Sequence, residues 1–585
     1  MRRLPYILVF LAACAAFACG VTRGHLNLDD WGYTAGCAFV RGGLSWANVA
    51  TAFRDLGHGG IWMPLTSVSY MLDFSLFGGG WAAHHAVNVA LHAANAALLL
   101  LFLRTLLGSR ARPWALCAAT LAWAVHPMRA EAVTWIASRK EELWFFFGLA
   151  GLVCWARFSA RGGRRLFVAA QLLFAAAMLS KPTAVCLPVL ACLTARFAAP
   201  SAPRRPLRYV PSLLMAFAVG LVAMHSQAHP TGMAAIDVGD TTFAWRLLNA
   251  LVSLGLYCVH AAWPVGLRFD YRAVFGEWPL HGVLGLSALI AVVAALAAAT
   301  GILRRRVRDA GRRAWLSSML GFSFASALVA VLPVLGLLGV TGDKAFADRY
   351  SYLPAAFLAL PVACLIEAAA RRRPRLTAAA AAILVCALAA LAIPTVRAFG
   401  SDLTIYARVL ADDPDHWRAL RVLGGEACAR EGRMDDGIAM LRRSLRLRPS
   451  ASTAAALAYV LACRGEKGDL DEVRRLGSGV SQDVRRDCEG LMLDALAIAA
   501  FREGDEEEAI RLFGAALTAP MRSHGNHYAM LNFGFALANV GRIAEALDML
   551  DKLAAVRDAQ VRDRAAAAAR QIRSGVFARF TWVGE

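Results

Sequence analysis

Apolar runs separated by short polar turns fill the first two thirds of the chain. A transmembrane helix needs about 20 mainly apolar residues to cross the hydrocarbon core of a bilayer. Twelve runs approach that length, near residues 4–21, 84–107, 113–126, 142–158, 166–179, 183–198, 209–225, 246–263, 281–303, 315–340, 353–370 and 376–394. The pattern predicts an all-α fold built around a polytopic membrane helix bundle.

Arginine-rich turns between the runs indicate how this bundle is oriented. They occur at 157–165, 304–313 and 371–375. Cytoplasmic loops of membrane proteins carry such an excess of Lys and Arg. We therefore expect these turns and the N-terminus to be cytoplasmic, and the loop after the first run to lie outside. We interpret the first run as an uncleaved span and not as a signal peptide, because further spans follow it.

One run must fail to cross, because five runs separate the first two arginine-rich turns where an even number is required. We assign this exception to 246–263, whose Tyr257 and Trp263 suit an interfacial or re-entrant helix better than lipid. The alternative is an irregular region at 166–198. About eleven spans then remain, in a membrane domain of residues 1–398.

After about residue 400 the charges follow helical spacing and a glycine-led motif repeats. It begins at Gly432, Gly504 and Gly541, with a weaker copy at Gly468, so the glycines are 36 or 37 residues apart. The tetratricopeptide repeat has a period of about 34 residues. Residues 399–585 are therefore expected to form a periplasmic, TPR-like α-solenoid. Its concave face would hold an extended peptide, or the repeats would serve as a spacer or an oligomerisation module.

The composition agrees with a membrane protein and argues against a nucleic-acid-binding, a disulfide-rich or a zinc-binding protein. Hydrophobic residues make up 58% of the 585 residues, and the mean hydropathy is +0.49. A formal charge of +20 would suggest a nucleic-acid partner for a soluble protein, but many of the arginines lie in turns between spans. We therefore expect no nucleic-acid partner. The 13 cysteines include no C-x-x-C pair, which argues against a disulfide framework or a zinc site.

Two adjacent acids follow the first apolar run directly. Asp29 and Asp30, in the stretch H-L-N-L-D-D-W-G-Y from His25, would lie just outside the hydrocarbon on the far side of the membrane. A carboxylate at this boundary faces a polar cavity, binds a cation or accepts a proton, unless it belongs to a solvated loop.

Three further polar clusters fall on the same face. They are H-P-M-R-A-E-A-V-T-W-I-A-S-R-K-E-E-L from His126, with Glu131, Arg139 and Lys140; G-D-K-A-F-A-D-R-Y-S-Y-L-P from Gly342, with Asp348, Arg349 and Tyr350; and Ser180-Lys181-Pro182. Guanidinium and ammonium groups at this depth suit a phosphate, although ion pairs that anchor a helix end would also explain them. No G-K-[ST] loop or nucleophile elbow is present. The set therefore fits transfer from a lipid-phosphate donor better than nucleotide chemistry.

Five stretches carry a resemblance to a known family. They are W-M-P-L-T-S-V-S-Y-M-L-D-F-S-L-F-G at 62–78, the H-x-x-N-x-x-L-H-x-x-N run from His85, the stretch from His126, S-K-P-T-A-V-C-L-P and A-D-R-Y-S-Y-L-P. In this order they resemble the transmembrane and tetratricopeptide-repeat (TMTC-like) O-mannosyltransferases and their bacterial relatives, in the GT-C glycosyltransferase superfamily. The resemblance implies an inverting enzyme with a polyprenyl-phosphate sugar donor that transfers mannose to Ser or Thr hydroxyls.

The residues and the resemblance together give each candidate a role. Asp29 or Asp30 would be the catalytic base. The donor phosphate would be bound by Arg139, Lys140, Lys181 and Arg349, with His126, Glu131, Asp348 and Tyr350 in support. The acid that commonly follows the family's lysine is Pro182 here. A divalent cation is left open as a cofactor, because no ligand set in the chain demands one.

The expected partners are a polyprenyl-phosphate sugar, an exported polypeptide held by the repeats, and the bilayer of the inner (cytoplasmic) membrane. One alternative keeps the enzyme and changes its acceptor to a lipid-linked glycan or a surface polysaccharide. A second is a non-catalytic, membrane-anchored TPR scaffold for envelope assembly. A transporter is the third.

Overall fold

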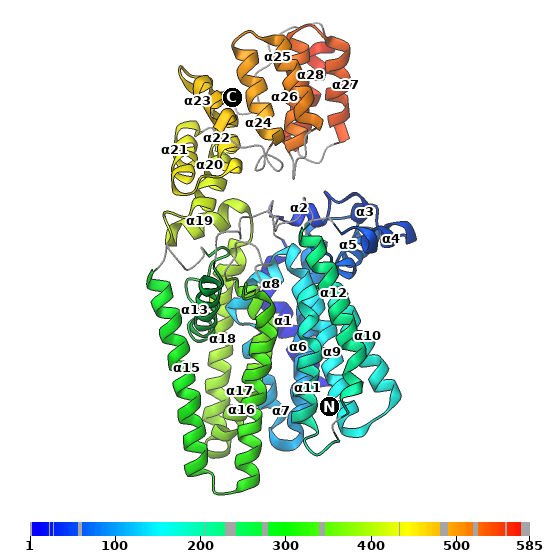
Figure 1. The fold of residues 1–585 in the computed structure, drawn as a ribbon, viewed down its shortest axis with the longest axis vertical. Coiled ribbons are helices and arrows are strands. Elements are labelled where there is room, and N and C mark those ends of the chain that lie inside the picture. Colours follow the sequence, from blue (N-terminus) through cyan, green and yellow to red (C-terminus); the bar gives the residue numbers. More distant parts are fainter. Residues whose placement is uncertain are drawn as a thin grey trace. The chain divides into compact units, whose positions relative to one another are not determined.

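The computed structural model describes residues 3–22, 24–26, 29–56, 61–203, 205–228, 242–271, 279–337, 346–431, 433–479, 489–518, 525–555 and 559–574. They form two compact units, Met1–Ser401 and Asp402–Glu585. Every regular element in these ranges is helical, which confirms the predicted all-α class. Each unit is described by itself below (Figure 1).

The first unit is a bundle of long apolar helices. They are α1 (Leu4–Phe17), α6 (Trp81–Leu107), α7 (Pro113–Ala124), α9 (Arg139–Arg161), α10 (Arg164–Ser180), α11 (Leu187–Ala198), α12 (Val210–Ala228), α13 (Phe243–Ala262), α15 (Pro279–Arg306), α16 (Ala310–Val331), α17 (Tyr352–Arg372) and α18 (Pro374–Ala398). These twelve helices coincide with the twelve apolar runs. Eight helical stretches in the described residues are long and apolar enough to cross a membrane, so the multi-pass prediction is confirmed.

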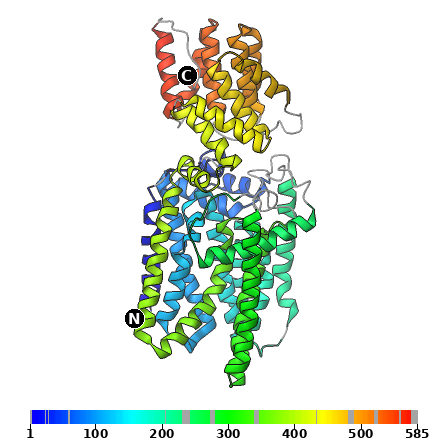
Figure 2. The same cartoon turned by 90° about the vertical axis from the view of Figure 1, so that its left-hand side faces the viewer.

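The helix corresponding to 246–263 lies differently from its neighbours. Figure 1 shows α13 nearly end-on, and Figure 2 shows it lying across the lengthwise helices of the bundle. It packs closely on α15, because a Cβ atom at Gly255 would lie only 1.7 Å from the carbonyl oxygen of Gly285. Trp245 and Trp263, near its two ends, are exposed. This arrangement favours an interfacial α13, although its length alone would allow it to span.

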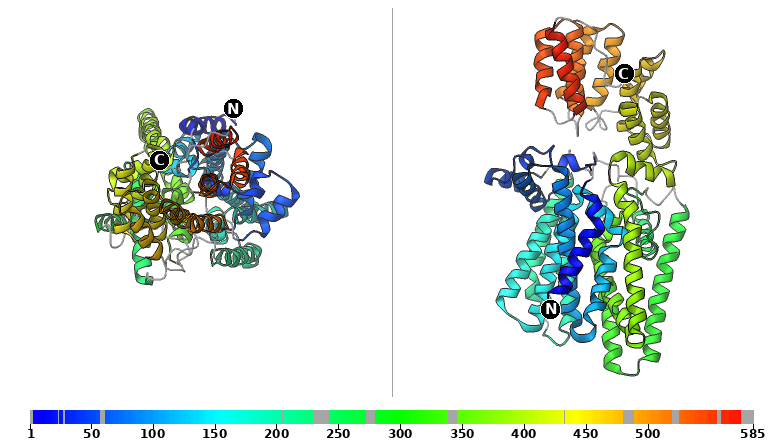
Figure 3. Two further views of the ribbon diagram at one scale, coloured as in Figure 1. Left: turned by 90° about the horizontal axis from the view of Figure 1, so that it is seen from above. Right: turned by 180° about the vertical axis from the view of Figure 1, so that it is seen from behind.

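Short elements gather at one end of the first unit. They are α2 (Asp30–Tyr33), α3 (Ala38–Arg41), α4 (Trp46–Arg54), α5 (Pro64–Phe77), η4 (Pro127–Arg129), α8 (Ala130–Thr134), η5 (Ile136–Ser138), η6 (Pro182–Cys186) and η10 (Asp348–Ser351). Pro127 and Pro182 each begin a new turn, since proline lacks the N–H needed inside a helix. The arginine-rich turns after α9, α15 and α17 lie at the opposite end, as Figures 1 and 3 show.

A polar face on α6 holds the bundle together from inside. Asn88 donates a hydrogen bond to the carbonyl oxygen of Trp135 (3.4 Å), and Asn95 donates to that of Glu142 (3.0 Å). His92 bonds the carbonyl oxygen of Ala124 through Nε2 (2.9 Å). Buried amide and imidazole groups join neighbouring helices in this way because lipid offers them no partners. The face therefore has a structural role.

The second unit stacks pairs of helices into an α-solenoid. Its elements are α19 (Asp402–Asp412), α20 (Trp417–Glu431), α21 (Met434–Leu447), α22 (Ala451–Arg464), α23 (Asp469–Gly479), α24 (Glu489–Arg502), α25 (Glu506–Thr518), α26 (Gly525–Asn539), α27 (Ile543–Lys552) and α28 (Ala559–Arg573). The repeat glycines Gly468, Gly504 and Gly541 sit in the turns between paired helices with φ of +91°, +89° and +82°. Only glycine adopts this conformation without strain, which explains their regular spacing. Gly432 lies outside the described residues.

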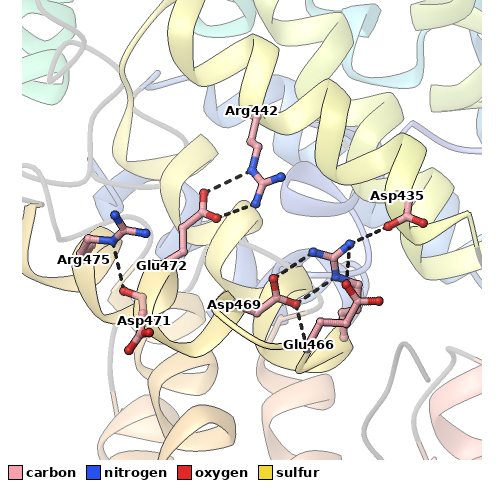
Figure 4. Close-up of polar contacts among 8 residues, drawn as sticks. Asp435, Arg442, Glu466, Asp469, Asp471, Glu472 and Arg475 are labelled. Carbon is pink, nitrogen blue, oxygen red and sulfur yellow. Dashed lines mark hydrogen bonds and ion pairs between the residues drawn. The ribbon is translucent and has the colours of Figure 1, made fainter.

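Ion pairs join successive helices of the solenoid (Figure 4). Arg464 on α22 contacts Asp435 (2.5 Å) on the preceding helix and Asp469 (2.9 Å) on the following one. Arg442 and Glu472 pair across α21 and α23 (2.5 Å). Partly exposed pairs of this kind contribute about 0–1 kcal/mol each, so they refine the register while the apolar core stabilises the stack.

Candidate functional site

Asp30 is a buried carboxylate in the loop that follows α1 and η1. Its Oδ2 atom accepts a hydrogen bond from the amide of Leu26 (2.9 Å), and its Oδ1 atom accepts one from the amide of Ala137 (2.8 Å). Both carboxylate oxygens are therefore engaged by backbone groups. Asp30 fastens the loop to η5, directly before α9, and this is a positioning role.

Asp29 lies beside it in a different environment. It occupies the N-cap position of α2, yet its side chain makes no capping hydrogen bond, and it is partly exposed. It lies within electrostatic range of Lys140 and Tyr33. Of the two adjacent acids, Asp29 is thus the one whose side chain is partly exposed.

Lys140 is a buried ammonium group on aromatic faces. Its Nζ atom lies 4.6 Å from the ring centroid of Tyr33 and 6.0 Å from that of Trp135. Among the described residues, no carboxylate lies within ion-pair distance of it. Lys181 and Arg349 are close enough to act on its charge. A buried cation without a contacting anion is an anion-binding feature.

Lys181 and Arg349 differ from Lys140 because each has its own glutamate. Lys181 forms an ion pair with Glu141, and Arg349 forms one with Glu131. The amide of Arg349 also donates to Glu131 (2.9 Å). Both cations also lie over aromatic rings. The Nζ atom of Lys181 is 5.0 Å from the ring centroid of Tyr350. The Arg349 guanidinium lies 5.2 Å from that of Trp135.

Three predicted phosphate ligands thus converge, and their charges can be counted. Lys140, Lys181 and Arg349 bring three positive charges, which Glu131 and Glu141 reduce to one. Asp29 stands beside this cluster as a further carboxylate. With Asp29 counted, the six charges sum to zero, and Lys140 is the cation of the three that has no contacting glutamate among the described residues.

Arg139 faces away from this cluster although it precedes Lys140 in sequence. Its guanidinium pairs with Asp73 (2.6 Å) and donates to the Asn88 side chain (2.7 Å) and the His84 carbonyl oxygen (2.9 Å). Successive residues on a helix point about 100° apart, so neighbours in sequence serve different surroundings. The guanidinium group of Arg139 is therefore engaged by the neighbouring helices, and it does not join the cluster of Lys140, Lys181 and Arg349.

The remaining predicted residues support the site from the side of α13. Asp348 contacts His260 (2.9 Å) and accepts from the Tyr271 hydroxyl (2.9 Å). His126 contacts the carbonyl oxygen of Ala261 (3.2 Å). Tyr350 accepts a hydrogen bond from Arg349 (3.1 Å). Asp348 and His126 therefore hold the end of α13 next to η10 and do not face Lys140.

The sequence did not single out three residues that contribute to this cluster of cations. Glu141 neutralises Lys181, and Tyr33 and Trp135 provide the aromatic floor of the cluster. All three lie inside motifs that the sequence made conspicuous. Their roles depend on tertiary partners that no spacing in the chain reveals. Within the described ranges, no group of three or more His, Cys, Asp or Glu side chains is placed to hold a metal ion.

Comparison with known proteins gives relatives for part of the chain, whereas no family model matches it. It is similar to protein O-mannosyl-transferase Tmtc2 of Drosophila melanogaster, with 35% identity over 169 residues. Tmtc1 of the same organism is 33% identical over 155 residues. The matched part of this chain is TMTC-like. Each match covers 25% of this chain and 17% of the TMTC relative, so it concerns only a small part of each relative's length.

Proposed function

We propose that this chain is a membrane glycosyltransferase that moves mannose or another hexose from polyprenyl phosphate to a hydroxyl group of an exported polypeptide. The observation that carries the proposal is the accessible Asp29 carboxylate beside the unpaired, buried ammonium of Lys140. The similarity to protein O-mannosyl-transferases supports the same reaction class.

Asp29 would act as the general base. A Ser or Thr hydroxyl loses its proton to the Asp29 carboxylate while its oxygen forms a bond to the anomeric carbon. The bond from that carbon to the phosphate oxygen breaks, and the configuration inverts. A base must reach the hydroxyl within hydrogen-bond distance, and Asp30 secures this by fixing the loop to η5.

Lys140, with Lys181 and Arg349 beside it, would stabilise the departing phosphate. A sugar joined to a lipid through one phosphate is a phosphodiester with a single negative charge, whereas a diphosphate linkage carries two. Once Asp29 takes up the proton, the three cations and two glutamates keep a net single positive charge, which matches the phosphodiester. A positive charge held at the developing oxyanion in a water-poor site lowers the barrier by several kcal/mol.

The arginine-rich turns give the proposal its orientation. They lie at the end of the bundle opposite α2, which Asp29 precedes directly. With these turns in the cytoplasm, the site faces the outside of the inner membrane, where exported polypeptides are found. The solenoid, which follows α18 in the chain, would capture the acceptor through its TPR-like repeats.

The proposal is tested by transfer with the full-length protein reconstituted in liposomes. Radiolabelled mannose on polyprenyl phosphate or on polyprenyl diphosphate is supplied with a Ser/Thr-containing peptide or its alanine counterpart. We expect label on the hydroxyl-bearing peptide from the monophosphate donor alone. Label on lipid-linked glycan instead would change the acceptor, and no transfer to any acceptor would favour a scaffold.

A further inference from the structure

Glu142 is a second carboxylate in the first unit, and the proposed reaction does not use it. It lies on α9, is fully buried, and neither of its carboxylate oxygens has a hydrogen-bond partner among the described residues. An isolated carboxylate in a low-dielectric interior is strongly destabilised unless a positive charge or a proton accompanies it. Something must therefore balance Glu142.

Two neighbouring donors of the described residues, the Asn95 amide and the Tyr352 hydroxyl, are engaged elsewhere. The two amide hydrogens of Asn95 are directed to the Glu142 carbonyl oxygen (3.0 Å) and the Tyr352 hydroxyl (3.2 Å). His92 donates from Nε2 to the Ala124 carbonyl oxygen, so its neutral ring accepts at Nδ1 from Tyr352 (2.7 Å). The hydroxyl proton of Tyr352 is thereby committed as well.

The nearest cation in sequence is also committed. Arg139 forms its ion pair with Asp73 and spends its other nitrogens on Asn88 and on backbone carbonyls. Lys140 faces the aromatic rings of the site described above. Arg139 lies close enough to act on the charge of Glu142, but no described side chain forms a hydrogen bond or an ion pair with its carboxylate.

Other oxygen atoms in the same region also have no hydrogen-bond partner in the part of the chain that the structure describes. Asn95 is fully buried and its Oδ1 atom makes no hydrogen bond, while its amide nitrogen contacts the Glu142 backbone. Ser138 is fully buried too, and its Oγ atom has no partner. Ser138 is the N-cap residue of α9, four positions before Glu142, so it stands about one turn ahead of Glu142. These oxygens, together with the two of Glu142, can all accept or coordinate, and the Ser138 hydroxyl is the one among the four that can also donate.

We propose that Glu142, Asn95 and Ser138 form a binding site for a monovalent metal cation such as Na⁺. Alkali ions are hard cations that bind oxygen ligands, and these three residues supply only oxygen. One carboxylate balances the single charge of an alkali ion, whereas a protein site for a divalent ion usually has more than one carboxylate. The bound ion joins α6 to the start of α9 and so stabilises the helical turn that carries Arg139 and Lys140.

The test is the thermal unfolding of the purified full-length protein in detergent. Its Tm is measured in NaCl, KCl and N-methylglucamine chloride at equal ionic strength and pH. We expect Na⁺ or K⁺ to raise the Tm by at least about 2 °C over N-methylglucamine, with saturation. The variant Glu142→Gln, which removes the charge but keeps the shape, should lose this response.

Glu367→Gln is the matched control. Glu367 is a glutamate on α17 that pairs with Arg371 (3.3 Å), and its loss should leave the cation response intact. Equal Tm values of the parent protein in all three salts would overturn the proposal, as would an unchanged cation response in Glu142→Gln. A Tm that depends on pH through Glu142 but on no metal cation would also overturn it and assign a bound proton instead.

Discussion

The two adjacent aspartates show how strongly environment separates identical side chains. Asp30 is enclosed and bonded to two backbone amides, whereas Asp29 presents an unbonded carboxylate beside Lys140. The first is suited to hold a loop and the second to accept a proton. The same division appears in many enzymes in which two acids share a site and perform different tasks.

Lys140→Met should weaken donor binding without unfolding the protein. The substitution keeps the aliphatic stem against Tyr33 and Trp135 and removes the charge that we propose binds the donor phosphate. A hydrogen bond to a charged group contributes about 1.5–3 kcal/mol, so the efficiency of transfer should fall about 10- to 150-fold. Initial rates against donor concentration measure this. Lys467→Met, at an exposed position of the second unit, should leave the rates unchanged.

Arg139→Met should act on stability. Its loss leaves the buried Asp73 carboxylate with His84 as its remaining ionic contact. Removing one partner of a buried ion pair destabilises a protein by about 3–5 kcal/mol. Thermal unfolding in detergent checks this, and the double variant Asp73→Asn/Arg139→Met should recover part of the loss. A stable Arg139→Met protein with impaired donor binding would instead return Arg139 to the phosphate site.

The residue types of the site could be predicted from the sequence, but their pairing could not. Acids and cations stand out beside apolar runs because they are costly there. The sequence could not show that Arg139 turns to Asp73 while Lys140 turns to Tyr33. That division depends on where α5 and α2 pack, which is a property of the folded chain.

At the scale of elements, patterning predicted the long helices well and the short ones poorly. The apolar runs mark the twelve long helices, and the glycine period marks turns whose positive φ requires glycine. The helix α5 was not among the predicted spans, since Thr66, Tyr70 and Asp73 interrupt its apolar character. It packs at the end of the bundle, where Thr66 donates to the carbonyl oxygen of Ser180 (2.8 Å).

The solenoid should lose stability as the pH rises, through Asp494 on α24. Burial raises the pKa of Asp494 to about 7, although Asn532 donates a hydrogen bond to it (3.1 Å). The folded pKa exceeds the unfolded value of about 3.9, so the folded state binds more protons. Stability should therefore decline from about pH 4 and level off above pH 7, by about 4 kcal/mol in total.

Hydrogen exchange of the α24 amides in the full-length protein at pH 5 and pH 8, corrected for intrinsic exchange, measures this decline. Asp494→Asn should abolish the pH dependence and protect α24 at pH 8. Asp471→Asn, at an exposed position on α23, should leave the pH dependence of α24 exchange as in the parent protein. Equal protection at both pH values in the parent would contradict a buried, protonated Asp494.

At the scale of the whole chain, the sequence predicts a sidedness that protease access can measure. Gly162 and Gly163 form the turn between α9 and α10 among arginines, and Gly78 and Gly79 form the turn between α5 and α6. A protease site inserted at Gly162 should be cleaved only from the cytoplasmic side. The matched insertion at Gly79 should be cleaved only from outside. The opposite result would place Asp29 in the cytoplasm and exclude an exported acceptor.

The central claim is that Asp29 removes the proton from the acceptor while Asp30 only holds the loop. The most direct measurement is the single-turnover rate of sugar transfer from polyprenyl-phosphate mannose to a Ser/Thr peptide, with saturating substrates, for Asp29→Asn and Asp30→Asn. We predict that Asp29→Asn slows transfer about 10²- to 10⁴-fold with the Tm unchanged. Asp30→Asn should lower the Tm and leave the folded protein active. A parental rate in Asp29→Asn would contradict the account.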